Sequence, residues 1–228
     1  MPTVLLIRHG VTAANQGGTL AGWTPGVDLA DAGRDQAAAL AERLRPVPVT
    51  RVVSSPLERC MQTADALAAG RGLEVETDDR LGEAKYGEWT GGSLKTLAKD
   101  KLWRVVQAHP SAARFPGGES LRETSARAVA AVRERNESMA DTDTWIVVSH
   151  GDVIKAIVAD ALGLHLDMFQ RIVIDPCSLT VVRYTEFRPF LTRLNDTGGG
   201  VADLMPPKRR RRRRASSDAP VGGGSGER

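Results

Sequence analysis

The sequence predicts a three-layer α/β fold, with a mainly parallel sheet covered by helices on both faces. Two observations support this. Short apolar runs alternate along the chain with segments of helical periodicity, which is typical of repeated β-α-β units. Two of these runs, residues 3–8 and 144–149, are apolar without alternation, as expected of strands buried on both faces. The length of 228 residues, with 41% hydrophobic and 26% charged residues, suits one sizeable globular domain.

The first half of the chain is expected to contain three strands and two helices. After the strand at 3–8, a helix is predicted to begin near Asp31 and to end before Pro46. Its buried face is marked by residues at 4-3-4 spacing: Gly33, Ala37, Leu40 and Leu44. A strand over 51–54 leads into Ser55-Pro56-Leu57-Glu58, which has the pattern of a capping box that opens the second helix. A further strand is expected over 73–76.

The second half begins with a glycine-rich stretch, residues 77–92, which lacks periodicity and is interpreted as a long functional loop. Helices are expected near 93–108 and 120–138, the second announced by a capping box from Ser120 to Glu123. A strand over 144–149 precedes an almost wholly apolar helix, 153–162. The segments 172–184 and 188–194 have the composition of the last strands.

The positive net charge is concentrated at one end of the chain. Residues 195–228 contain 8 Lys/Arg against 4 Asp/Glu, which leaves 23 and 24 for residues 1–194. The composition predicts a catalytic domain over 1–194 and a disordered, basic, Gly/Ser/Pro-rich tail over 195–228. The run Lys208–Arg214 is suited to nonspecific contact with polyanions.

No apolar run is long enough to cross a membrane, and the first residues do not resemble a secretory signal, so a cytoplasmic protein is expected. Cys60 and Cys177 form no CxxC pattern, so neither a disulfide framework nor a zinc site is indicated. Both are expected to be buried thiols.

Candidate functional groups follow three of the predicted strands. They are Arg8-His9-Gly10, Ser54-Ser55 with Arg59 one turn into the next helix, and Ser149-His150-Gly151. Ligands of parallel α/β sheets bind outside the carboxyl ends of the strands, so these three groups are expected to converge on one crevice.

Residues of these types are suited to the transfer of a phosphoryl group. Arg8 and Arg59 can bind a phosphate ester through charged, bidentate hydrogen bonds. His9, as a neutral imidazole, can attack phosphorus through one ring nitrogen while the other is held by a hydrogen bond. We expect His150 to be a protonated phosphate ligand, and the helix that begins at Gly151 to direct free N–H groups at the same anion.

A leaving alkoxide must also receive a proton, which requires an acid. The loop at 81–89 offers two carboxyl groups, Glu83 and Glu88. Their spacing alone does not distinguish between them.

Taken together, these residues resemble the histidine phosphatase superfamily, which includes cofactor-dependent phosphoglycerate mutases and many small-molecule phosphatases. The matching segments occur in order over about residues 3–184 and are Arg8-His9-Gly10 with Asn15, Asp28-Leu29 ahead of Gly33 and Gln36, Ser54-Ser55-Pro56-Leu57 with Arg59 and Thr63, Leu81-Gly82-Glu83 with Tyr86-Gly87, Pro116-Gly117-Gly118-Glu119-Ser120, and Ser149-His150-Gly151. One departure is Ala30, where relatives commonly have Thr.

The resemblance implies a phosphohistidine intermediate on His9 and Glu83 as the proton donor. It implies phosphate contacts from Arg8, Asn15, Arg59 and His150. It implies neither a metal nor another cofactor.

The expected function is therefore hydrolysis of a small-molecule phosphate monoester. The main alternative is a phosphoglycerate mutase, but mutases have a longer, more Arg-rich insert before the late His, whereas residues 110–120 contain only Arg114. A polyanion-binding protein that acts through the tail, and a catalytically silent scaffold, are weaker alternatives. Residues 84–118 are expected to determine specificity, with Lys85, Trp89, Trp103 and Phe115 as candidates for the mouth of the pocket. The substrate and the oligomeric state stay open.

Overall fold

A six-stranded mixed sheet forms the centre of the molecule in the computed structural model, which describes residues 2–198. The strand order is β3-β2-β4-β1-β5-β6. β1, β2, β3 and β4 pair in parallel, whereas β5 pairs antiparallel with β1 and β6 antiparallel with β5. The strands are β1 (Thr3–Arg8), β2 (Val49–Ser54), β3 (Val75–Thr77), β4 (Thr144–Ser149), β5 (Leu179–Tyr184) and β6 (Pro189–Asp196). The expected polyanion contact by Lys208–Arg214 lies outside the described residues.

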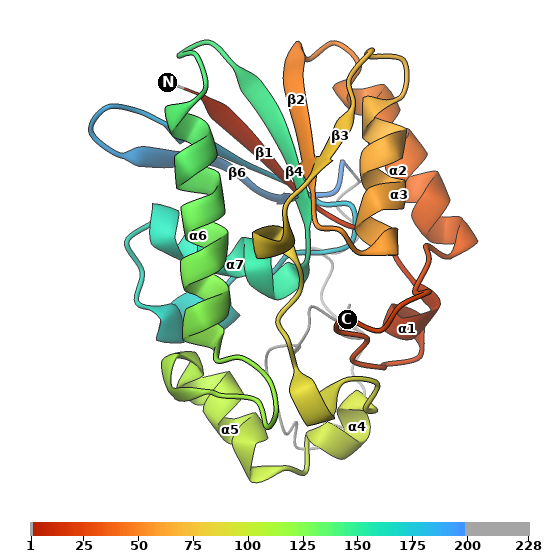
Figure 1. Cartoon of the computed structure of the whole chain (residues 1–228), viewed down its shortest axis with the longest axis vertical. Coiled ribbons are helices and arrows are strands. Elements are labelled where there is room, and N and C mark those ends of the chain that lie inside the picture. The colour runs from red at the N-terminus through yellow and green to blue at the C-terminus, as the bar shows by residue number, and fades with distance from the viewer. Residues whose placement is uncertain (1, 199–228) are drawn as a thin grey trace, which may run out of the picture.

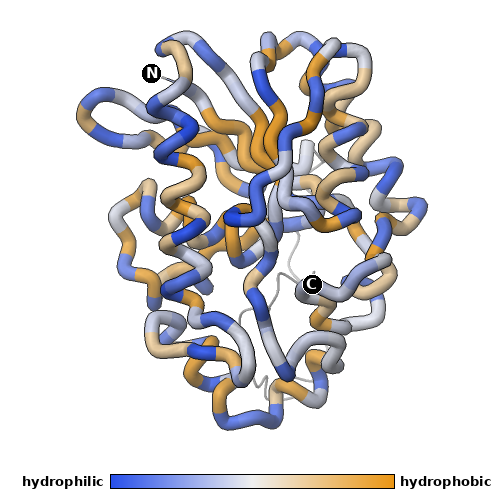
Figure 2. Tube along the Cα trace, in the orientation of Figure 1, coloured by the Kyte–Doolittle hydropathy of each residue, from blue (hydrophilic) through white to orange (hydrophobic). Residues whose placement is uncertain are grey.

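Helices cover both faces of this sheet, so the predicted three-layer α/β class is confirmed (Figure 1). One pair, α2 (Asp31–Leu44) and α3 (Glu58–Ala68), packs against one face, and α6 (Leu121–Glu137) with α7 (Gly151–Ala161) packs against the other. Side chains alternate along β1 accordingly. Leu5 and Ile7 lie in the hydrophobic cluster that includes α2 and α3, and Val4 and Leu6 lie in the cluster that includes α6 and α7. Figure 2 shows the hydropathy that results, with the most apolar segments in the central strands.

The start of α3 differs from the prediction. The helix begins at Glu58 and its N-cap residue is Leu57, so Ser55 and Glu58 do not form the expected capping box. Instead, the Ser55 hydroxyl lies 2.8 Å from Nε2 of His150. The Ser55 hydroxyl, which the local sequence pattern predicts to cap the helix, therefore hydrogen bonds with a buried side chain that follows another strand. The capping box of α6, with Ser120 and Glu123, is present as predicted.

Two other elements are shorter than predicted. The helix expected near 93–108 is divided into α4 (Leu94–Leu97) and α5 (Lys101–Ala108), because Asp100 caps a new helix by accepting the N–H of Leu102. The strand expected to begin at 172 begins at 179, since Cys177 adopts a positive φ of 52°. The Cys177 N–H instead donates to the carbonyl oxygen of Arg8, at 3.0 Å. Both cysteines are buried, as expected.

The segment 77–92 is irregular, as predicted, with short 3-10 turns at Asp79–Leu81 and Gly87–Trp89. It leaves the carboxyl end of β3 and runs past the ends of the parallel strands toward α4 and α5 (Figure 1). Among residues 2–198, no helix has the length and apolar character needed to cross a membrane.

Candidate active site

The three groups predicted to converge do lie at neighbouring strand ends. In the sheet register Arg8 pairs with Ser149, and Ser54 pairs with Val148, so β1, β4 and β2 end side by side. The His9 N–H donates to the Ser149 carbonyl oxygen at 3.0 Å, which extends this pairing by one residue. The ladder of the sheet thus places His9 next to His150, with their ring centroids 5.2 Å apart.

Close backbone approach brings the start of α2 against the residues that follow His9. A Cβ atom on Gly10 would lie only 2.5 Å from the carbonyl oxygen of Gly33, and one on Gly33 would lie 2.1 Å from that of Val11. Only glycine fits at both positions, which explains in physical terms why glycine follows His9.

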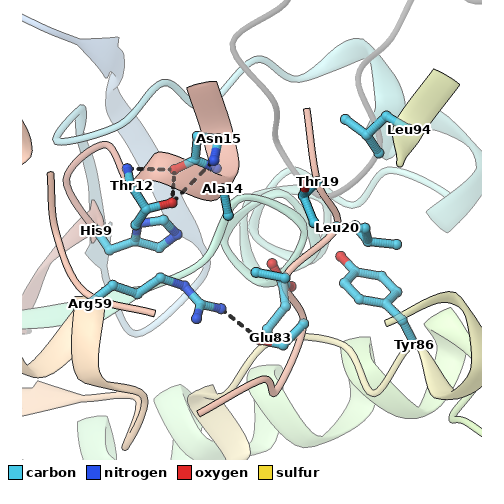
Figure 3. Close-up of a pocket in the computed structure, with 12 residues that line it drawn as sticks. His9, Thr12, Ala14, Asn15, Thr19, Leu20, Arg59, Glu83, Tyr86 and Leu94 are labelled. Carbon is cyan, nitrogen blue, oxygen red and sulfur yellow. Dashed lines mark hydrogen bonds between the residues drawn. The ribbon is translucent and has the colours of Figure 1, made fainter. Parts of the chain in front are cut away.

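A cavity opens at this end of the sheet (Figure 3). Four of the predicted site residues line it: His9, Asn15, Arg59 and Glu83. Arg8 and His150 are buried behind it, with exposures of 1% and 0%. The remaining lining residues are Thr12, Ala14, Thr19, Leu20, Ala21, Gly22, Tyr86 and Leu94.

The hydrogen bond of His9 selects one tautomer of its ring. Nδ1 lies 2.7 Å from the Gly10 carbonyl oxygen, which can only accept, so Nδ1 carries the proton and Nε2 carries the lone pair. Burial, together with the positive charges of Arg59 and Arg8, lowers the pKa of His9 well below its ordinary value. At neutral pH the imidazole is therefore neutral, with a nucleophilic Nε2.

Arg8 and Arg59 bring two positive charges into this buried region. Arg8 donates through Nη1 to the Ile174 carbonyl oxygen at 2.8 Å, and Arg59 donates through Nη2 to that of Gly22, also at 2.8 Å. Among the described residues, Nε and Nη2 of Arg8 and Nη1 of Arg59 are buried and have no protein hydrogen-bond partner. Buried donors of this kind are normally satisfied, so they are suited to an anion.

His150 is neutral in this arrangement, which differs from the protonated form expected from the sequence. Its Nδ1 lies 3.3 Å from Nη2 of Arg59, a group that can only donate, so Nδ1 accepts and Nε2–H donates to Ser55. Burial, followed by the charge of Arg59, lowers the pKa of His150 well below its ordinary value. Contact of His150 with phosphate stays a prediction.

Of the two candidate acids, the structure places Glu83 at the cavity, whereas Glu88 is exposed and does not line it. The Glu83 backbone is held by its carbonyl oxygen, which accepts from Nε1 of Trp23 at 2.6 Å and from Nη2 of Arg127 at 2.9 Å. Its Oε1 accepts the Ala84 N–H at 2.9 Å. Burial and then the charge of Asp152 raise the pKa of Glu83 to about 7. A carboxyl group with that pKa can hold a proton near neutral pH and release it.

Asn15 lines the cavity from the short helix α1 (Ala13–Gln16). Its Oδ1 accepts from the backbone N–H and the hydroxyl of Thr12, both at 3.0 Å (Figure 3). These contacts belong to the capping box of α1, so the amide oxygen of Asn15 already has partners. A contact between Asn15 and an anion would therefore come from its Nδ2 group.

The expectation for the mouth of the pocket is wrong for the three aromatic residues. Trp89, Trp103 and Phe115 are all at most 5% exposed and pack on one another, with Trp89 and Phe115 ring centroids 5.4 Å apart. They form part of the hydrophobic core on the α6 and α7 side of the sheet. Lys85 is exposed, with its Nζ 5.6 Å from the Trp23 ring centroid.

Residues 19–22 form a wall of the cavity that the sequence did not predict. This segment has no periodicity and no charged side chain, so nothing in the sequence marked it. The buried pair Asp152 and Lys155 on α7 was also not predicted, and the available signal was two charged residues one turn apart at the start of a mostly apolar helix.

Comparison with known proteins agrees with this geometry. The sequence matches the histidine phosphatase superfamily (branch 1) over residues 4–197. A Yersinia pestis protein described as "probable phosphoglycerate mutase GpmB" is 33% identical over 188 residues, which cover 82% of this chain and 86% of that protein.

Two solved structures are also similar. YhfR of Bacillus stearothermophilus superposes with a TM-score of 0.81 at 25% identity, covering 86% of this chain and 98% of that one. A mycobacterial glucosyl-3-phosphoglycerate phosphatase, solved with VO3, gives 0.78 at 29% identity, covering 85% and 98%. The chain belongs to the histidine phosphatase superfamily.

Proposed function

We propose that this enzyme hydrolyses a small-molecule phosphate monoester through a phosphohistidine intermediate on His9, with Glu83 as the proton donor. The observation that supports this most strongly is the set of buried, unpartnered guanidinium N–H groups of Arg8 and Arg59 beside a neutral imidazole. A phosphate dianion would satisfy these donors, and its phosphorus would lie within reach of His9.

In the first step, Nε2 of His9 attacks phosphorus and the bond between phosphorus and the leaving oxygen breaks. The proton of Glu83 passes to that oxygen, so the product leaves as a neutral alcohol. Glu83 becomes a carboxylate, and His9 carries the phosphoryl group. Arg8 and Arg59 stabilise the negative charge on the phosphoryl oxygens throughout.

In the second step, the Glu83 carboxylate removes a proton from a water molecule whose oxygen attacks the phosphohistidine. The bond between phosphorus and Nε2 of His9 breaks, inorganic phosphate forms, and Glu83 is protonated again. The same carboxyl group thus acts first as an acid and then as a base.

The nucleophile is tested by substituting His9→Ala, with His165→Ala as a matched control at an exposed position. We expect His9→Ala to reduce turnover of a phosphate ester by roughly 10⁴-fold, because the side chain proposed to form the covalent intermediate is removed. Quenched wild-type enzyme should contain a phosphoryl group that is stable in alkali and labile in acid, and the control should behave like wild type. A labile phosphoryl group that persisted in His9→Ala would contradict the assignment.

Mutase activity is a second candidate, favoured by the similarity to the Yersinia pestis protein. A phosphoglycerate substrate carries a carboxylate as well as a phosphate, yet Arg59 is the only Lys or Arg among the residues that line the cavity in the described part of the chain. Release of inorganic phosphate should be compared with mutase turnover in the presence of bisphosphoglycerate. Mutase turnover equal to or above hydrolysis would overturn the hydrolase proposal.

The substrate itself calls for a screen of phosphorylated metabolites. The similarity to the mycobacterial enzyme makes phosphorylated glucosyl glycerates one class to include. Each compound should be assayed in parallel with wild type and His9→Ala, so that contaminating phosphatase activity is recognised.

A further inference from the structure

A buried ion pair lies behind the acid side of the cavity and has no role in the two steps above. Asp152 and Lys155 are each 1% exposed and lie one turn apart on α7, with Nζ 3.4 Å from Oδ1. Lys155 also donates to Oε1 of Gln170 at 3.2 Å and lies 5.6 Å from the ring centroid of Phe169. An apolar pair of similar volume is often as stable as a buried ion pair, so stability alone gives little reason for these charges.

Tyr86 connects this pair to the proposed proton donor. Its hydroxyl oxygen lies 3.2 Å from Oδ2 of Asp152 and is within hydrogen-bonding reach of the Glu83 side chain. The Tyr86 ring is fully buried and packs edge-on against Phe115, with centroids 4.9 Å apart. Packing therefore fixes the hydroxyl between the two carboxyl groups.

The single proton of this hydroxyl can serve only one of the two carboxyl groups. Ionised Asp152, held by Lys155, can only accept, so the Tyr86 O–H points to Asp152. The Tyr86 oxygen then presents lone pairs to Glu83. That contact is favourable when Glu83 carries a proton and unfavourable when Glu83 is ionised.

We propose that Asp152 is a positioning residue for the proton donor: with Lys155 it orients the Tyr86 hydroxyl as an acceptor, which retains the proton on Glu83 until the leaving group takes it. Oε1 of Glu83 accepts from the Ala84 N–H, so the retained proton belongs to Oε2. Rotation about the carboxyl C–O bond can redirect that proton from Tyr86 into the cavity. This inference rests on the proposed role of Glu83.

The charges around Glu83 act in opposite directions. Burial and Asp152 raise its pKa, whereas the Ala84 N–H, Arg59 and Arg8 lower it. His150 lies 3.9 Å from Oε2 and is neutral, and Arg127 binds the backbone carbonyl oxygen of Glu83. Asp152 is thus the one negative charge among these neighbours, and its removal should favour ionised Glu83.

The test is Asp152→Asn, which keeps the shape of the side chain and removes its charge. Turnover should be measured across pH with two esters: p-nitrophenyl phosphate, whose leaving group needs no proton, and glycerol 2-phosphate, whose alkoxide does. We expect turnover of the aryl ester to stay within about threefold of wild type. Turnover of the alkyl ester should fall about fivefold at pH 7 and about tenfold at higher pH, as the alkaline limb of its profile moves about one pH unit lower.

Asp160→Asn is the matched control, because Asp160 lies on the same helix but pairs with Arg133 at the surface. It should leave both profiles unchanged. A second variant, Tyr86→Phe, removes the hydroxyl, keeps the ring and should cause the same selective loss. It replaces Asp152→Asn if that protein does not fold.

Equal loss on both esters, with no displacement of the alkaline limb, would mean that Asp152 acts only in folding and would overturn the inference. Unchanged turnover of the alkyl ester would overturn it as well. Both outcomes leave the proposed function intact, because wild type would still release phosphate. Wild-type enzyme that hydrolysed neither ester and formed no phosphohistidine would overturn the proposed function and this inference together.

Discussion

The buried charged groups at the two ends of the cavity differ in whether they have partners within the protein. At the phosphate end, Arg8 and Arg59 present guanidinium N–H groups that have no protein partner in the described chain. At the proton end, Glu83 contacts Tyr86, which contacts Asp152, which in turn pairs with Lys155. The first end offers hydrogen-bond donors to a ligand, whereas the polar groups at the second end already bind one another.

This difference shows how one buried site can both bind an anion and keep an acid protonated. Desolvation disfavours the unpaired guanidinium groups, and burial does lower the pKa of Arg8. An arriving phosphate removes that penalty, so part of its binding energy comes from donors that the fold has already desolvated. The proton end needs no such ligand, because its charges already have partners.

Loss of a guanidinium at the phosphate end should have a larger effect than any change at the proton end. We expect Arg8→Met or Arg59→Met to reduce kcat/KM by about 10²- to 10³-fold, since the phosphoryl charge loses a preorganised donor. Inorganic phosphate should raise the Tm of wild type and raise that of these variants much less. Thermal unfolding with and without phosphate measures this.

Arg104→Met, at an exposed position on α5, is the matched control and should keep both the activity and the response to phosphate. An Arg8→Met protein that phosphate stabilised as strongly as wild type would break the distinction between the two ends.

At the proton end, Glu83→Gln should reduce turnover of an alkyl phosphate by about 10²-fold and that of p-nitrophenyl phosphate far less. Because the pKa of Glu83 is raised to about 7, alkyl ester turnover by wild type should decline as the pH rises through 7. Glu88→Gln, which alters the exposed alternative acid, should match wild type. Equal loss on both esters would contradict the assigned role.

The same substitution should change how stability depends on pH. The folded protein retains a proton on Glu83 from pH 4.5 up to about 7, where the unfolded chain has lost it. The stability that the folded protein gains from this raised pKa is fully present below pH 4.5 and is lost as the pH rises to about 7. Relative to wild type, Glu83→Gln should gain up to about 3 kcal/mol in free energy of unfolding between those limits. Denaturant titrations at pH 4.5 and pH 8 measure the gain.

The smallest expected effect comes from a change that leaves both ends intact. Ala30 is the N-cap residue of α2 and makes no side-chain cap, whereas Ser120 caps α6. Ala30→Ser should raise the free energy of unfolding by about 1 kcal/mol, because its hydroxyl can accept an orphan N–H of the first turn. Denaturant titration measures this, with Ala30→Val as a control that adds bulk without a cap. A change in kcat/KM would mean that the start of α2 affects the cavity, contrary to this expectation.

Much of the fold could be predicted because the pattern of buried side chains is local. The apolar runs at 3–8 and 144–149 became β1 and β4 with the same bounds, and the capping box at Ser120 began α6. Prediction failed where a group distant in sequence formed a hydrogen bond with a group that the local pattern assigned to a helix end or a strand. Ser55 bonds His150 rather than capping α3, and the Cys177 N–H bonds the backbone of Arg8 rather than extending β5.

The site shows the same division. Strand ends predicted that Arg8, His9, Arg59 and His150 would lie together, since parallel strands end at one edge of a sheet. Spacing could not choose between Glu83 and Glu88, and burial separates them. The aromatic residues Trp89, Trp103 and Phe115 were misplaced at the pocket mouth because composition does not reveal which side chains the assembled fold buries.

The sequence by itself determined the fold class, the family and the chemical types present at the site, because these follow from periodicity and from residues beside strand ends. Only the tertiary structure decided the protonation of those residues. The tautomers of His9 and His150, and the orientation of the Tyr86 hydroxyl, depend on partners from other elements. Burial makes each of these contacts strong, and burial is a property of the assembled fold rather than of any local segment.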